Sequence, residues 1–370
     1  MLKHLPHQVA LTVKKWSYLL FLVPALLPFI SHVLGNHFDN HNLWAFTTVT
    51  FVFGLVPLLD PIIGKDPINP DEQDEVPTME EDPFYKRLTL LSVPLYLILV
   101  FWSAHIFTAE QFNWVGKLGW MLSIGTVGAL AITIAHELIH KDEKLERLFG
   151  GVLLSLVSYG GFKVEHLRGH HVNVSTPLDA SSARFNQSLY QFLPHAYLHN
   201  FLNAWKLEKK RLSKKGKSLL SFQNELIWWY GLSLFWLILC FAFWGVGGAV
   251  FFLAQSFVAF TLLEIVNYLE HYGLHRRKLE NGRFERVQPE HSWNSNYFLT
   301  NLFLFHLQRH SDHHANAKRR YQVLRHYDHA PQLPAGYATM VLLALIPPLW
   351  FKVMNPKVEA YYQHEHHQLQ

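Results

Sequence analysis

Histidine dominates four short segments of this chain, which has 370 residues and 25 histidines. The segments read HELIH at 136–140, EHLRGHH at 165–171, NYLEHYGL at 267–274 and LQRHSDHH at 307–314. They contain nine histidines: His136, His140, His166, His170, His171, His271, His310, His313 and His314. Imidazole is the commonest metal ligand among side chains, so the pattern predicts a metal site.

The spacing within two of the segments predicts how their rings point. His136 and His140 are four residues apart, so on a helix they lie on the same face. His310, His313 and His314 are related as i, i+3 and i+4, which also places them on a single helical face. Each of these segments can therefore present its histidines together to one region of the protein.

The EHLRGHH segment departs from this rule. His166 and His170 share a helical face, whereas His171 is rotated away from it at about 3.6 residues per turn. We therefore expect either that His171 serves a second metal or that Gly169 distorts the backbone. One transition-metal ion accepts roughly four to six ligands, so nine imidazoles suit two ions better than one. The ligand type leaves the metal open among zinc, copper, iron and nickel.

Polar side chains close to these histidines are candidates for orienting the imidazole rings through their N–H groups. They are Glu137, Glu165, Glu264, Asn267, Glu270 and Asp312. Glu264 falls inside an apolar run, where an ionisable group is costly unless it faces protein or a cavity. The alternative for each carboxylate is an ordinary solvated or salt-bridged group.

Composition places the histidine segments in a membrane protein. Hydrophobic residues make up 50% of the chain and charged residues 16%, against roughly 25% charged residues in soluble domains. Six apolar runs are long enough to cross a bilayer: residues 16–34, 43–59, 88–108, 118–135, 225–244 and 247–266. We expect an all-α, polytopic protein with a single catalytic domain, 1–370. Its cytoplasmic helical cap would comprise 136–224 and 267–337, and 361–370 would form a flexible tail.

Charges and cysteine usage indicate the orientation in the membrane and exclude several kinds of site and partner. Lys and Arg precede the first apolar run and follow the second, which predicts that both termini and all the histidine segments are cytoplasmic. The single cysteine, Cys240, excludes an intrachain disulfide, a Cys-type zinc site and a protein-bound iron–sulfur centre. The net charge of +4 gives no reason to expect nucleic acid as a partner, and the sequence has no dinucleotide-binding glycine motif.

A basic run at 206–217 precedes the fifth apolar run. Five of its members are candidates for docking an acidic protein: Lys209, Lys210, Arg211, Lys214 and Lys215. The alternative is a face that meets solvent or lipid headgroups.

The four histidine segments, in this order and combined with six expected spans, resemble the integral-membrane non-haem diiron alkane monooxygenases. These belong with the membrane desaturases and hydroxylases that share histidine boxes. HxxxH and HxxHH are common to that superfamily, whereas NYLEHYGL and LQRHSDHH are much more specific to the alkane hydroxylases. The resemblance extends from the first apolar run to about residue 331.

The resemblance implies two iron ions held by the nine histidines, in a protein of the bacterial inner membrane. It further implies oxygen-dependent hydroxylation of medium-chain n-alkanes to 1-alkanols. Electrons would come from rubredoxin, itself reduced by an NAD(P)H-dependent reductase. Some relatives carry a fused rubredoxin module, and the cysteines of such a module are absent from this sequence.

An alkane substrate would also constrain the shape of the site that binds it. An alkane dissolved in lipid gains little hydrophobic free energy in an apolar tunnel, because lipid tails are as apolar as leucine. Selection among chain lengths must then depend on the shape of a tunnel between the spans. Candidate lining residues are Trp44, Phe51, Ile132, Thr133, Phe260 and Leu263, for each of which ordinary helix packing is the alternative.

Three other functions are compatible with histidines in a membrane protein. A membrane fatty-acyl desaturase or hydroxylase would need a polar entrance for a headgroup or carrier. A metal transporter would place its ligands near the bilayer midplane, with repeats and broken helices, rather than at helix ends. A structural zinc scaffold would bind zinc stably and turn over no substrate.

Overall fold

The computed structural model describes residues 5–110 and 112–365, and the chain is helical through most of them. Within this part of the chain, extended pairing is limited to isolated bridges, in agreement with the all-α prediction. Four helices are long and apolar enough to cross a membrane: His7–Phe38, Pro83–Ala109, Trp114–Ile139 and Glu225–His271. The protein is therefore an integral membrane protein.

The first two expected runs differ in their regularity. The first is continuous and comprises α1 (His7–Ser17), η2 (Tyr18–Phe21) and α2 (Leu22–Phe38). The second is divided into α3 (His41–Trp44), α4 (Thr47–Thr50), the π-helical η3 (Phe51–Leu55) and α5 (Val56–Ile63). Its apolar helical part, Thr47–Ile63, is shorter than the four long helices.

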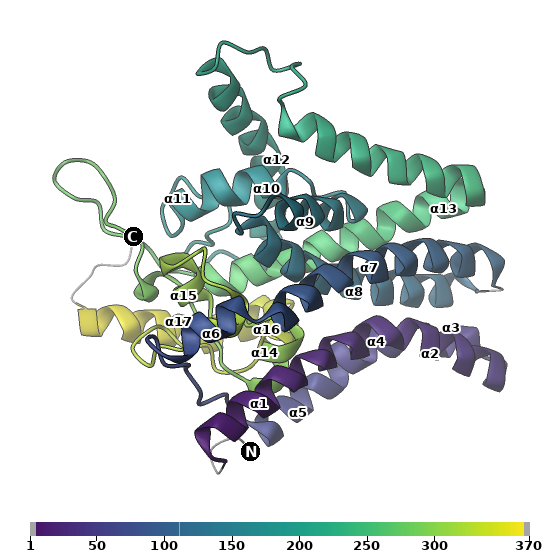
Figure 1. The fold of residues 1–370 in the computed structure, drawn as a ribbon, viewed down its shortest axis with the longest axis horizontal. Coiled ribbons are helices and arrows are strands. Elements are labelled where there is room, and N and C mark those ends of the chain that lie inside the picture. Colours follow the sequence, from purple (N-terminus) through teal and green to yellow (C-terminus); the bar gives the residue numbers. More distant parts are fainter. Residues whose placement is uncertain (1–4, 111, 366–370) are drawn as a thin grey trace.

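The third and fourth runs form α7 (Pro83–Ala109) and α8 (Trp114–Ile139), which lie side by side in Figure 1. Both begin at side-chain caps, because Asp82 accepts a hydrogen bond from the Phe84 amide and Asn113 accepts one from the Gly116 amide. A Cβ at Gly125 would lie 2.4 Å from the Val258 side chain. This glycine therefore lets α8 approach the next long helix closely.

That helix, α13 (Glu225–His271), spans 47 residues but reverses direction within its length (Figure 1). The reversal is at Gly245, where φ is 61° and ψ is −153°, a conformation that glycine adopts without the strain of a Cβ. The two arms of α13 on either side of Gly245 correspond to the expected runs 225–244 and 247–266.

Shorter elements gather at one end of the long helices (Figure 1). The segments between α8 and α13 are α9 (Lys144–Leu156), α10 (Phe162–Glu165), η4 (His166–His170), α11 (His171–Asn173) and α12 (Leu189–Ser213). After α13 come η5 (Pro289–His291), α14 (Phe298–Phe303), α15 (His310–Ala315), η6 (Tyr321–Val323), α16 (Tyr337–Ala344) and α17 (Pro347–Glu365). The short helix α6 (Glu75–Glu81) joins them from the N-terminal half.

The C-terminal end differs from the expectation of a flexible tail at 361–370. Helix α17 continues through Tyr361 and Tyr362 to Glu365. The remaining residues of the expected tail, 366–370, lie outside the described part of the chain. Buried Trp350, Met354 and Val358 fasten α17 to the cluster that contains Tyr268 and Tyr272 of the α13 region, so the helix has a packed apolar side that stabilises it.

Candidate metal centre

The first two histidines lie at the C-terminal end of α8, just after its apolar stretch. His136 lies in its last turn and His140 is the residue that caps its C-terminal end. Both side chains are buried, and their ring centroids are 5.1 Å apart. The same helix that is long enough to cross the membrane thus aims both rings into the end of the bundle.

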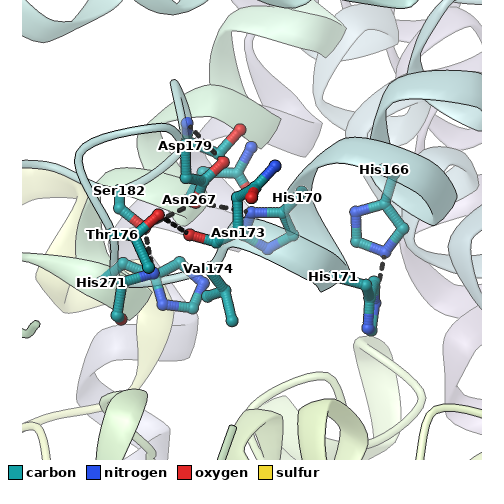
Figure 2. A network of polar contacts seen from close by, with 12 residues as sticks. His166, His170, His171, Asn173, Val174, Thr176, Asp179, Ser182, Asn267 and His271 are labelled. Atoms are coloured by element: carbon teal, nitrogen blue, oxygen red, sulfur yellow. Dashed lines mark hydrogen bonds and ion pairs between the residues drawn. The ribbon is translucent and has the colours of Figure 1, made fainter. Parts of the chain in front are cut away.

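The segment from His166 to His170 is a π-helix, so the backbone departs from the regular helix on which the expected pairing depended. A π-turn brings residues i and i+5 together, and the Nε2 atoms of His166 and His171 lie 3.0 Å apart. His170 points elsewhere, toward Asp179 (Figure 2). A Cβ at Gly169 would lie 2.3 Å from Glu165 Oε1, so a larger residue could not occupy this turn without moving that carboxyl group.

The nine histidines fall into two groups. Five form one group, whose ligand atoms all lie within 4.8 Å of one another: His136, His140, His166, His171 and His313. Four form the other: His170, His271, His310 and His314. His271, the single histidine of NYLEHYGL, therefore belongs to the four-histidine group. Helix α15 supplies both groups, since it directs His313 to the first and His310 and His314 to the second.

Distances between the ring nitrogens fit ligands that share an ion. In the five-histidine group, Nε2 of His166 lies 3.0 Å from that of His140, and Nε2 of His313 lies 3.1 Å from that of His171. Two nitrogens about 2.1 Å from one ion, at a right angle, would be separated by roughly 3.0 Å. Nε2 of His136 is buried and has no hydrogen-bond partner, as expected of an atom reserved for a metal.

The four-histidine group has the same construction. Nε2 of His310 lies 2.9 Å from that of His314 and 3.2 Å from that of His271. Nε2 of His170 lies 3.2 Å from that of His314. Each set of donors is therefore compatible with one transition-metal ion.

The surroundings of the histidines favour the uncharged form of most of these imidazole rings. Burial, followed by the neighbouring histidines, lowers the pKa of His166, His171 and His313 well below the usual value. The same causes lower the pKa of His310 and His314. These imidazoles are neutral at pH 7 and keep the lone pair that a metal requires.

His170 is held by a carboxylate that the sequence did not reveal. Its Nδ1 lies 2.9 Å from Asp179 Oδ2, and the Ser182 hydroxyl donates to the same oxygen at 2.6 Å (Figure 2). Burial alone would lower the pKa of His170, but Asp179 outweighs it and raises that pKa. Asp179 fixes the ring so that Nε2 faces the other three histidines, as carboxylates do beside metal-bound imidazoles.

We expect Asp179→Asn to weaken metal binding by the four-histidine group roughly 10–100-fold, because the neutral amide orients His170 less firmly. Metal retained after dialysis against a graded chelator series measures this effect. Asp328→Asn is the matched control, since the Asp328 side chain is fully exposed beside His326. Equal retention in the two variants would contradict a role for Asp179 in positioning His170.

Of the five carboxylates singled out in the sequence, Glu270 alone lies within ion-pair distance of a ligand nitrogen in the described part of the chain. Its Oε2 is 3.2 Å from His310 Nε2, and its Oε1 accepts a hydrogen bond from Tyr337. Glu137 instead pairs with Lys141 at 2.9 Å.

The other polar candidates hold the surrounding framework. Glu264 accepts hydrogen bonds from Asn267 and Asn200. Asp312 accepts from the Arg325 amide and the Tyr327 hydroxyl. Glu165 accepts from Asn203, and burial, followed by the charge of Asp179, raises the pKa of Glu165 to about 8.

A buried ion-pair network anchors α15, although neither its geometry nor its partners were predicted. Arg309, next to the first histidine of α15, is fully buried, and its Nη2 lies 2.9 Å from Asp66 Oδ2. Lys14 Nζ lies 2.7 Å from the same oxygen. Burial raises the pKa of Asp66, but Lys14 and Arg309 outweigh it and hold that pKa below its usual range. The network therefore ties the start of α15 to the N-terminal helix.

An apolar cavity of about 80 Å³ leads toward the five-histidine group. Its lining includes Val52, Thr126, Ala129, Thr133, Leu263 and Val341. A smaller cavity shares Thr133, Leu304 and Leu307 with it and reaches His136 and His313. The apolar space between the helices therefore lies next to the smaller cavity that reaches the histidines.

The sequence-based tunnel candidates occupy different places. Thr133 and Leu263 line the apolar cavity. The other four are absent from its lining: Trp44, Phe51, Ile132 and Phe260. Phe51 packs against Phe303, which does line the cavity, at 5.9 Å between ring centroids.

The fatty acid desaturase family model matches residues 112–344, which include all four histidine segments. The chain belongs to this family of membrane enzymes.

Individual relatives define the group more closely. The chain is 60% identical over 361 residues to alkane 1-monooxygenase 2 of Pseudomonas aeruginosa, covering 97% of this chain and 96% of that protein. It is 59% identical to alkane 1-monooxygenase 2 of Alcanivorax borkumensis, covering 98% and 95%. A more distant relative is the xylene/toluene monooxygenase hydroxylase component of Pseudomonas putida, 26% identical over 90% of this chain and 86% of that protein. Within its family, the chain is thus one of the alkane 1-monooxygenases, which are oxidoreductases.

Proposed function

We propose that this protein hydroxylates a terminal methyl group of medium-chain n-alkanes, using dioxygen, at two iron ions held by its nine histidines. The observation that carries the proposal is the convergence of nine imidazoles, in groups of five and four, beside an apolar cavity. The alkane 1-monooxygenase relatives support the choice of substrate.

The overall reaction converts an alkane, dioxygen, two electrons and two protons into a 1-alkanol and water. Iron would supply the redox chemistry that oxygen activation requires, which zinc cannot. His136, His140, His166, His171 and His313 would hold one ion, and His170, His271, His310 and His314 the other. The cavity residues would exclude water and direct one end of the alkane toward the His136 and His313 side of the centre.

The decisive experiment is a metal count on the purified protein combined with an oxidation assay. We expect about two irons per chain by the ligand count, and 1-octanol from octane with one oxygen atom derived from labelled dioxygen. Turnover of an acyl substrate without oxidation of any n-alkane would favour a desaturase or acyl hydroxylase. Firmly bound zinc without turnover would favour a structural scaffold.

Alkane length should respond to the width of the apolar cavity. Ala129 lines it one turn of α8 before Thr133, so Ala129→Phe should fill its middle. We expect activity on dodecane to fall about tenfold, the cost of a misfit of one or two carbon units, while hexane is still hydroxylated. Alkanols formed from a C6 to C12 series measure the shift.

The matched control for Ala129→Phe is Leu118→Phe on an exposed part of the same helix. Its product profile should follow that of the unmodified protein. An unchanged profile in Ala129→Phe would show that the alkane does not use this cavity.

We further propose that the protein lies in the bacterial inner membrane with both termini and the metal centre on the cytoplasmic side. Rubredoxin, reduced by an NAD(P)H-dependent reductase, would deliver electrons there. The basic end of α12 supports a docking place because it is linked to the histidine-bearing π-turn. Glu208 of α12 pairs with Arg211 and, at 2.8 Å, with Arg168 of that turn. The neighbouring lysines Lys209, Lys210, Lys214 and Lys215 are exposed.

Neutralising two of these lysines tests the docking proposal. We expect Lys209→Gln/Lys210→Gln to raise the apparent KM for rubredoxin at low salt, and the difference to shrink at high salt as charges are screened. Lys278→Gln/Lys352→Gln removes the same charge from exposed positions elsewhere. A KM that changes equally in both variants, or in neither, would reject α12 as the docking place.

A further inference from the structure

A third cluster of potential ligands lies outside the nine-histidine centre. It consists of His32 on α2, His41 at the start of α3 and Glu110 directly after α7. His32 Nδ1 is 3.3 Å from Glu110 Oε1, and His41 Nε2 is 3.4 Å from Glu110 Oε2. We propose that these three side chains bind a divalent transition-metal ion, for which Zn²⁺ is the best match.

The distances favour an ion between the groups. Both exceed the roughly 2.7–3.2 Å typical of an N–H···O hydrogen bond, whereas ligand atoms at such separations can each lie about 2.1 Å from one zinc ion. His32 Nδ1 is also buried without a hydrogen-bond partner. The Asn36 side-chain amide lies 3.1 Å from the other ring nitrogen, Nε2. Metal binding through Nδ1 requires the ring proton on Nε2, so with a metal bound Asn36 would turn its amide oxygen toward Nε2 and accept that hydrogen bond.

The surroundings hold the two rings in place. A Cβ at Gly35 would lie 2.5 Å from His41 Nδ1, so the glycine leaves the space that the ring occupies. Trp102 packs edge-on against His32 at 5.7 Å, and Phe112 packs edge-on against His41 at 6.1 Å. Two imidazoles, one carboxylate and an open position for water form a donor set that zinc accepts.

The cluster is remote from the nine histidines. It lies where α7 ends and α8 is about to begin, whereas His136 and His140 lie at the opposite end of α8. The 26 residues of α8 separate the two places by about 39 Å at 1.5 Å per residue. An ion in the cluster would connect the α2–α3 turn to the end of α7 and stabilise the packing of that end of the bundle.

Titration of iron-loaded protein with Zn²⁺ tests the proposal. We expect one zinc per chain to bind while the iron content stays constant. The zinc dissociation constant should rise by at least about tenfold in Glu110→Gln and in His41→Ala, because loss of a ligand should cost no less than the roughly 10–100-fold typical of losing a group that only orients one. His37→Ala removes an exposed histidine from the same helix as His32 and should bind zinc normally.

Two further readouts separate this site from the iron centre. Zinc K-edge absorption should show two imidazoles, and Zn²⁺ should raise the apparent Tm of the unmodified protein and of His37→Ala but not of Glu110→Gln. Alkane oxidation by Glu110→Gln should equal that of the unmodified protein. Equal zinc uptake by all the variants, or zinc bound by four or more imidazoles with loss of iron, would overturn the proposal.

Discussion

Replacing His271 by alanine should abolish alkane hydroxylation. His271 is the only ligand candidate from its segment, and it completes the four-histidine group with its Nε2 3.2 Å from that of His310. The ion in this group would keep three of its four imidazoles. We expect activity to fall more than a hundredfold, beyond the roughly 10–100-fold typical of groups that only orient a ligand.

Iron analysis and 1-octanol formation measure the effect of His271→Ala. Iron should drop below two per chain while the helical content by circular dichroism is kept. His199→Ala, at an exposed position of α12, is the control and should retain both iron and activity. A His271→Ala protein with full iron and more than about a tenth of the activity would remove His271 from the proposed centre.

Replacing Arg309 by methionine should have the largest effect on stability. The side chain is fully buried, and its guanidinium also donates to the carbonyls of Leu324 and Ile68, at 2.6 and 3.1 Å. Methionine would leave these carbonyls without donors and Asp66 with Lys14 as its remaining cation. Breaking a buried pair in this way costs about 3–5 kcal/mol of unfolding free energy.

The apparent Tm in detergent measures the effect of Arg309→Met, and we expect a decrease of about 5 °C for a chain of this length. Arg309→Lys keeps the charge but loses the planar fork of donors, so its Tm should be intermediate. Arg277→Met is the matched control, because Arg277 is 59% exposed in its pair with Glu285 and such pairs contribute about 0–1 kcal/mol. Equal Tm values for Arg309→Met and Arg277→Met would contradict the anchoring role.

Sequence patterns predicted the features that depend on local periodicity. The long apolar runs correspond to helices, and the nine histidines converge. The expected alternative of a backbone distortion at Gly169 is confirmed by the π-turn, but the histidine spacing could not give the new register, because that register depends on how Glu165 and Gly169 pack. His170 was therefore paired with His166 in the expectation, whereas the structure places it with His271.

Residues that act across long sequence distances escaped prediction for a different reason. Asp179 reaches His170 from a loop, where no helical period relates the two. Arg309 stands inside a quoted histidine segment, but its partner Asp66 is separated from it by most of the chain. The local sequence around either residue does not predict such a pair, since the pairing is created by the tertiary fold.

The division of the histidines has a consequence for how the centre fills and empties. His170 and His171 are neighbours in the chain yet serve different groups, and the same is true of His313 and His314. Two single peptide units, each about 3.8 Å from Cα to Cα, therefore bridge the two sets of ligands. An ion that pulls one ring into place also sets the backbone of the next ring. Loading should consequently be cooperative, with half-filled molecules scarce at intermediate iron concentrations.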